Sequence, residues 1–147
     1  IPVAVDPKKD NFFAYQLCTL FKPNLREVKE SLHVQINPEN IESLNEAASI
    51  LHKHLHNGIT LITLGEKGIY LRSGNEVFTK AAHIRNVADV SGAGDTVISI
   101  AALCLAVKTP LDMLAALSNL AGGIVCEYPG VVSISKDTLL EEALQVL

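Results

Sequence analysis

The chain has 147 residues, the size of one ordinary domain, with a net charge of −4 and a hydrophobic fraction of 48%. The acidic balance and the lack of a basic cluster argue against a nucleic-acid partner. No apolar run reaches the roughly 18 residues that a membrane helix needs, so we also expect no membrane partner.

Cysteine usage and the first residues of the chain bear on its setting. Cys18, Cys104 and Cys126 show no C-x-x-C spacing, which favours free thiols in a reducing compartment and indicates the cytoplasm. The chain opens with "IPVAVDPKKD", within a predicted strand and without a methionine or a signal peptide. We therefore expect these residues to be a piece of a longer protein.

Strand and helix patterns alternate along the first part of the chain. Residues 3–6 and 18–24 predict short buried strands, each stopped by a proline that cannot continue a hydrogen-bonded ladder. Residues 38–58 predict a helix, because apolar residues recur at helical spacing between a proline in the first turn and a terminal glycine. The β-branched run at 59–65 predicts a strand, and residues 68–80 predict a hairpin that turns at its Ser-Gly-Asn sequence.

Helices dominate the second part of the chain. The apolar run after "SGAGD" predicts a helix that extends to Val107, and residues 109–127 predict another that begins near Pro110. Residues 131–135 predict one more strand, and residues 136–147 predict a closing helix. The alternation predicts an α/β fold, in which a mostly parallel sheet is covered on both faces.

The glycine-rich turn "SGAGD" at residues 91–95 is the strongest candidate for chemistry. Gly92 and Gly94 permit backbone conformations, and a close approach of a ligand, that other residues exclude. The helix that follows presents unpaired N–H groups and a positive dipole end, which together attract an anion. Asp95 has an alternative role as a helix cap, which is common for aspartate, and the turn alone does not decide between the two.

Two familiar phosphate-binding motifs do not match this turn. A P-loop requires G-x-x-x-x-G-K-[ST], which is absent, and a dinucleotide fingerprint needs a glycine where Val97 stands. A phosphotransferase accounts for the glycines and the carboxylate together. The turn amides would stabilise charge on the phosphoryl group in transfer, and Asp95 would take the proton of the attacking hydroxyl.

The wider motif "DVSGAGD" at residues 89–95 resembles the C-terminal signature D-[ST]-[ST]-G-A-G-D of the ribokinase-like (PfkB) carbohydrate kinases, with Val90 in place of a hydroxyl residue. The strings "DVSGAGDTVI", "VDPK" and "LFKPN" look most like the heptose-7-phosphate kinase branch of the bifunctional ADP-heptose synthesis enzymes. The resemblance covers essentially the whole chain and implies a ribokinase-like three-layer α/β/α sandwich. It identifies residues 1–147 as the C-terminal, nucleotide-binding half of a kinase domain, so that the fold is incomplete.

The resemblance also assigns roles to individual residues. It implies that Asp95 is the catalytic base and that Gly92, Ala93 and Gly94 form the anion hole of a reaction that uses ATP and Mg²⁺. Lys8 lies just past a strand end, where open α/β sheets place ligands. In the resembling branch this segment approaches the nucleotide phosphates, and an ordinary exposed lysine is the alternative.

A second motif, "TLGEKG", ends the strand predicted at residues 59–65 and matches the family pattern T-x-G-x-x-G. The match implies that Thr63, Gly65 and Gly68 lie on the nucleotide. A strand that runs into a hairpin turn would give the same letters, so this structural alternative stays open.

Three further matches concern metal ions and the adenine base. "NLRE" matches N-x-x-E, whose Asn24 and Glu27 would organise Mg²⁺ through water on the nucleotide side, although a capping box fits the same letters and both can hold. Asn119 matches an asparagine near the adenine, with a helix residue facing solvent as the alternative. Asp89 and Ser91 match positions that hold a monovalent cation such as K⁺ in many relatives.

The function implied is transfer of the ATP γ-phosphoryl group to a sugar hydroxyl. The implied acceptor is the anomeric hydroxyl of D-glycero-D-manno-heptose 7-phosphate, in ADP-heptose synthesis for the lipopolysaccharide core. Ribose, fructose or nucleoside kinases of the same family, and a non-catalytic nucleotide-binding module, are the alternatives. The family's N-terminal half, with most of the acceptor pocket, is not in these residues, so we expect little kinase activity from the chain alone. An uncovered sheet edge predicts association with that half or with a second copy.

Overall fold

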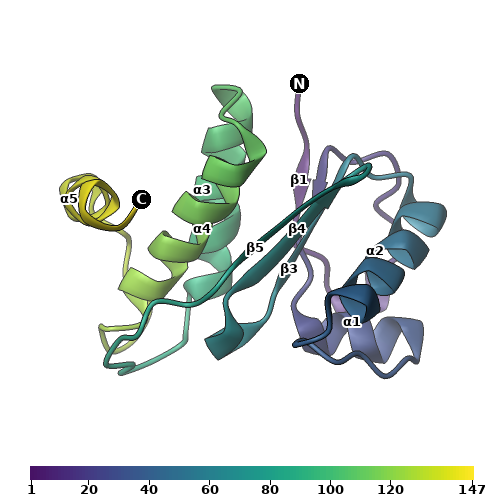
Figure 1. Cartoon of the computed structure of the whole chain (residues 1–147), viewed down its shortest axis with the longest axis horizontal. Coiled ribbons are helices and arrows are strands. Elements are labelled where there is room, and N and C mark those ends of the chain that lie inside the picture. Colours follow the sequence, from purple (N-terminus) through teal and green to yellow (C-terminus); the bar gives the residue numbers. More distant parts are fainter.

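A single five-stranded sheet with helices on both sides makes up the computed structural model, which describes all 147 residues (Figure 1). The strands lie side by side in the order of the sequence: β1 (Ala4–Val5), β2 (Leu20–Phe21), β3 (Ile59–Thr63), β4 (Ile69–Ser73) and β5 (Glu76–Lys80). β1, β2 and β3 pair in parallel, whereas β4 pairs antiparallel with both β3 and β5. The predicted hairpin is therefore confirmed, and β4 is the one strand that runs against the other four.

Four of the five helices cover the two faces of the sheet. α1 (Leu25–Leu32) and α2 (Ile41–Leu55) lie on one side, and α3 (Ala93–Ala106) and α4 (Leu111–Val125) lie on the other (Figure 1). α5 (Lys136–Val146) lies outside this sandwich and contacts α4. None of the helices is long and apolar enough to cross a membrane. The α/β class and the three layers expected from the sequence are both confirmed.

The strands bury alternate residues against opposite helix layers. Phe21 and Ile62 belong to the apolar cluster under α1 and α2, whereas their neighbours Leu20 and Leu61 belong to the cluster under α3 and α4. Because successive side chains of a strand point to opposite faces, a strand covered on both sides is mainly apolar on both. β3 is apolar apart from its two threonines, and the buried hydroxyl of Thr60 accepts a hydrogen bond. The type of this strand could therefore be predicted from local sequence.

The predicted helix at residues 38–58 is shorter in the structure. Asn40 is its N-cap and accepts hydrogen bonds from the N–H groups of Glu42 and Ser43, so Pro38 lies outside the helix. His56 ends it in a left-handed conformation, before Gly58 is reached. A side-chain cap that satisfies two free N–H groups outweighs the preference of proline for the first turn.

The strand predicted at residues 131–135 is wrong, because this segment forms no ladder with any part of the sheet. Val132 and Ile134 are half-buried and alternate with exposed residues, as in a strand. The segment instead crosses the start of α3, where Val131 packs against Gly92, and then enters α5. Alternating burial shows that one side of this segment faces the protein, but it does not show that another strand lies beside the segment to form hydrogen bonds with it.

Candidate functional site

A cleft of about 1210 Å³ opens at the edge of the sheet where β2 and β3 end. Its walls come from α1, the end of β3, the segment between β5 and α3, the first turns of α3, and α4. Parallel strands bring their carboxyl ends to one edge, which is where open α/β sheets bind ligands. The volume exceeds that of ordinary small-molecule pockets, so a nucleotide fits inside it.

The cleft gathers seven of the residues singled out from the sequence. Those that line it are Asn24, Thr63, Gly65, Gly68, Ala93, Gly94 and Asn119. Those that do not are Lys8, Glu27, Asp89, Ser91, Gly92 and Asp95. The two motifs "TLGEKG" and "SGAGD" thus meet across one cavity, although residues 69–90 separate them in the chain.

The N-terminus of α3 presents free backbone donors at this cleft. Gly92 is the N-cap, with φ of +80°, and no side chain caps the helix. The N–H groups of Gly92, Gly94 and Asp95 donate to no acceptor in the protein. Unpaired donors and the positive end of the helix dipole together favour an anion, so the residues present fit a phosphate group.

Asp95 is the third residue of α3, and its carboxylate is exposed. The interpretation of Asp95 as the helix cap is wrong, because Gly92 occupies that position and no side-chain cap bond is made. The carboxylate forms no ion pair, and it lies outside the residues that line the cleft. The turn therefore presents Gly94 to the cleft and an unengaged carboxylate beside it.

Lys22 is the site residue that the sequence analysis missed. Its side chain is only 3% exposed, and its Nζ lies 3.2 Å from Oδ1 of Asp6. A Cβ on Gly94 would lie 3.5 Å from the same Nζ, so the ammonium group stands beside the first turn of α3. Lys22 lies outside the residues that line the cleft, and Asp6 partly balances its charge, so the attraction that it adds for an anion is confined to the first turn of α3. The signal was available in the sequence: a lysine within the apolar strand predicted at residues 18–24, directly before a proline.

Asn24 and Glu27 form the capping box that was the structural alternative for "NLRE". Asn24 Oδ1 accepts from the Glu27 N–H at 2.8 Å, and Glu27 Oε2 accepts from the Asn24 N–H at 2.7 Å. No three His, Cys, Asp or Glu side chains cluster anywhere in the structure to hold a metal directly. Mg²⁺ commonly keeps several waters and binds through phosphates, so the second oxygen of Glu27 fits a water-mediated contact.

The two glycines of the "TLGEKG" turn are required for different reasons. A Cβ on Gly68, where φ is +92°, would lie 1.9 Å from the carbonyl oxygen of Lys80, so packing against the end of β5 excludes a side chain. Gly65 also has a positive φ, of +64°, but no atom lies within 4 Å of a Cβ there. Its open side faces the cleft, which leaves room for a ligand to approach the backbone.

Asn119 and Lys8 have opposite surroundings. Asn119 is 8% exposed, and its Nδ2 donates to the carbonyl of Ala81 at 2.8 Å, so the interpretation as a solvent-facing residue is wrong. This bond holds the segment after β5 against α4, at the wall of the cleft. Lys8 is exposed, outside the cleft and without an ion pair, as an ordinary surface lysine would be.

Asp89 anchors the turn before α3 rather than facing the cleft. Its carboxylate accepts from the N–H groups of Ser91 at 2.9 Å and Gly130 at 3.0 Å. The bond from Ser91, with that from Gly130, lowers the pKa of Asp89 below its usual value. Ser91 itself is exposed. A monovalent cation at these two residues stays a prediction.

Comparisons with known proteins agree with this geometry. The family model for pfkB family carbohydrate kinases matches residues 1–138. The chain is 39% identical over 140 residues to the bifunctional protein HldE of Koribacter versatilis, and 41% identical over 139 residues to that of Methylococcus capsulatus. The two matches cover 95% and 94% of this chain, but only 28% and 29% of the length of the relatives.

Solved structures show the same fold. Phosphofructokinase-2 from Escherichia coli, in complex with substrates and products, superposes with a TM-score of 0.87 at 18% identity, over 99% of this chain and 48% of that one. Arabidopsis thaliana ribokinase, complexed with ribose and ATP, gives 0.80 at 20% identity, over 96% and 47%. Identities this low concern the fold alone, whereas the family model spans nearly the whole chain. The chain belongs to the pfkB family of carbohydrate kinases.

Proposed function

We propose that this chain is the C-terminal, nucleotide-binding half of an ATP-dependent sugar kinase. The observation that carries the proposal is the turn at residues 92–95, where unpaired N–H groups and an unengaged carboxylate share one helix end beside a nucleotide-sized cleft. A helix end that bound phosphate alone would not need the carboxylate. A second substrate, with a proton to give up, accounts for it.

The residues divide the reaction between them. Asp95 takes the proton from the sugar hydroxyl, whose oxygen forms the new bond to the γ-phosphorus as the bond to the ADP oxygen breaks. The N–H groups of the turn and the Lys22 ammonium stabilise the charge on the phosphoryl group in transfer. Mg²⁺, when bound, neutralises phosphate charge, and Glu27 orients its water shell.

The proposed acceptor is the anomeric hydroxyl of D-glycero-D-manno-heptose 7-phosphate, in ADP-heptose synthesis. Curated relatives named bifunctional protein HldE, at 35–41% identity, support this branch of the family. The chain spans less than a third of those relatives and under half of the kinase structures it superposes on. The other half of the kinase domain would supply most of the acceptor pocket, and the free thiols suit a cytoplasmic reaction.

The deciding experiment compares Asp95→Asn with the unaltered protein, in a form that carries both halves of the kinase domain. If Asp95 is the base, kcat falls by about three orders of magnitude or more, while MgATP affinity stays within about twofold. Asp10→Asn makes the same change at an exposed carboxylate outside the cleft, so it is the matched control and should retain full activity. An unchanged kcat in Asp95→Asn would show that Asp95 is not the base. MgATP binding without turnover of any sugar by the unaltered protein would favour a non-catalytic nucleotide-binding module.

The acceptor is tested separately with a coupled ADP-release assay. Heptose 7-phosphate, ribose, fructose and a nucleoside are offered to the two-half protein and to the 147-residue chain alone. The proposal predicts turnover with the heptose phosphate in the first and almost none in the second. Preferred turnover of another sugar would move the protein to a different branch of the family, and robust turnover by the chain alone would contradict its assignment as half a domain.

A further inference from the structure

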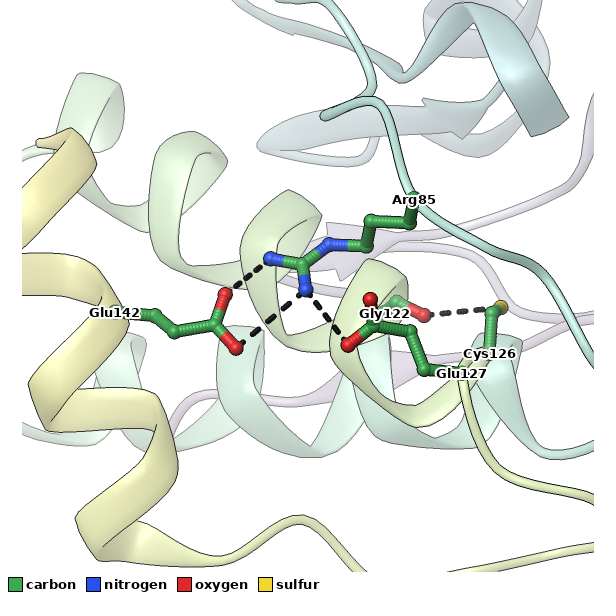
Figure 2. A network of polar contacts seen from close by, with 5 residues as sticks. All are labelled: Arg85, Gly122, Cys126, Glu127 and Glu142. Atoms are coloured by element: carbon green, nitrogen blue, oxygen red, sulfur yellow. Dashed lines mark hydrogen bonds and ion pairs between the residues drawn. The ribbon is translucent and has the colours of Figure 1, made fainter.

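Arg85 joins two parts of the molecule that are far apart in sequence. It lies between β5 and α3 and lines the cleft, and its side chain is only 10% exposed. Its Nη1 donates to Glu127, just after α4, at 3.0 Å, and its Nη2 donates to Glu142 of α5 (Figure 2). Nη1 also donates to the other carboxylate oxygen of Glu142, at 3.4 Å, so the contact between the guanidinium and that carboxylate is bidentate.

The last turn of α4 is shaped to let Arg85 pass. A Cβ on Gly123 would lie 3.0 Å from Nε of Arg85, so any larger residue there would require the Arg85 side chain to shift. The neighbouring residue, Gly122, is more tightly restricted, because a Cβ there would meet Val97 of α3 at 2.6 Å. Gly122 and Gly123 both line the cleft, so this wall is held by α3 through one glycine and by Arg85 through the other.

Two carboxylates are the polar partners that fix the Arg85 side chain. Its Nε is buried without an acceptor, so the polar end of the side chain is fixed by Glu127 and Glu142 alone. The hydrogen bond that Arg85 donates to Glu142 raises the pKa of Arg85, which keeps the guanidinium charged. Partial burial strengthens such a pair relative to one in open water.

α5 depends on this contact, because little else fastens it. None of its residues is buried, and Leu144 is 80% exposed. Leu139 is half-buried and packs against the core under α3 and α4. Loss of the Glu142 pair would therefore loosen α5 and leave Arg85 with Glu127 as its remaining partner, beside the open cleft.

We infer that Arg85 is a positioning residue that couples the docking of α5 to the shape of the nucleotide cleft. With α5 docked, Glu142 holds the Arg85 guanidinium, and the Arg85 side chain packs on Gly123 at the wall of the cleft. With α5 released, the segment at residues 82–87 and the wall at 122–126 lose their common tether. This rests on the proposed function in that a nucleotide is taken to occupy the cleft. Nucleotide affinity then scales with the fraction of molecules in which α5 is docked.

The test compares Glu142→Gln with Glu141→Gln in the 147-residue chain. Glu141 is exposed on the same helix and has no ion pair, so its variant makes the same charge change without touching Arg85. In Glu142→Gln we expect amide hydrogen exchange about tenfold faster in α5, with faster exchange also at 82–87 and 122–126. We also expect the MgATP dissociation constant to rise about tenfold if the docked fraction falls to about a tenth. Glu141→Gln should change none of these.

Arg85→Met completes the cycle. Both variants remove the contact between Arg85 and Glu142. Amide hydrogens in the double variant of Arg85→Met and Glu142→Gln should therefore exchange no faster than in Arg85→Met alone. Faster exchange confined to α5, with the cleft wall and MgATP affinity unchanged, would overturn the coupling and leave only a helix tether. If the unaltered chain binds no MgATP, the nucleotide assignment fails, while exchange at 82–87 and 122–126 still decides whether α5 and the cleft are coupled.

Discussion

The carboxyl ends of the parallel strands and the lateral edge of the sheet at β1 differ in how completely other elements cover them. At the cleft, β3 runs into a turn whose glycine packs directly against the end of β5, and α1, α3 and α4 close around the cavity. At the lateral edge of the sheet, β1 has two residues and a partner on one side only. Ile1 and Val3, just before it, are exposed.

This contrast fits the function proposed above. A cleft enclosed by several elements is preorganised for a ligand, as the proposed nucleotide site requires, whereas an open strand edge with apolar side chains is a template for pairing. Under the proposal, the other half of a kinase domain would cover that edge. Four substitutions test the two regions.

The largest effect is expected at the packed turn. Gly68→Ala forces a Cβ into the carbonyl of Lys80 and should destabilise the fold by about 4 kcal/mol or more, enough to leave the chain largely unfolded. Gly74→Ala, in the β4–β5 turn, also has a positive φ but open space around it, and should cost only about 1 kcal/mol. Urea unfolding of both variants gives the comparison, and equal losses would contradict the close approach at Gly68.

Lys22→Met should have the next largest effect. It strips Asp6 of its buried partner, and breaking such a pair costs about 3 kcal/mol, the low end of the usual range, since Asp6 keeps some contact with water. It also removes the cation beside Gly94, so MgATP should bind more weakly. Calorimetric titration with MgATP after correction for folded fraction separates the two effects. Unaltered affinity would mean that this lysine serves the fold alone.

Gly65→Ala tests whether the cleft receives phosphate at this turn. Its φ of +64° is close to that of Gly74, at +57°, and neither has a neighbour within 4 Å, so both variants should lose similar stability, about 1 kcal/mol. Only Gly65 lines the cleft, and a methyl group there would stand where a phosphate oxygen approaches. We expect MgATP affinity to fall about tenfold in Gly65→Ala and to stay unchanged in Gly74→Ala.

The smallest effect on stability is expected at the open edge. Val3→Lys keeps the backbone carbonyl that accepts from Thr19 and Leu20, and should shift the free energy of unfolding by no more than about 0.5 kcal/mol. A lysine on an edge strand opposes pairing with another chain. Light scattering should show association of the unaltered chain at high concentration and less of it in the variant. A clean monomer in both would show that this edge is not a pairing surface.

Local sequence was sufficient to predict an element wherever the interactions that form it lie within one short segment. The hairpin turn, the apolar run of β3, the capping box at Asn24 and the start of α3 after Gly92 all depend on residues within a few positions of one another. Seven residues that line the cleft could be named before the fold was known, because the sequence motifs that contain them resemble those of a known family. The prediction that Asp95 caps α3 is wrong because the N-cap position is occupied by Gly92.

Long-range packing accounts for the rest. The Lys22 ammonium meets Gly94, Arg85 grips a carboxylate 57 residues away, and Asn119 turns inward to the carbonyl of Ala81. The alternating residues at 131–135 form no strand, because no strand edge lies beside them. In each case the outcome depends on which surface the fold brings opposite the residue, and no spacing along the chain encodes that. The nucleotide motifs are a property of the sequence, whereas the buried charges around them arise only when the layers close.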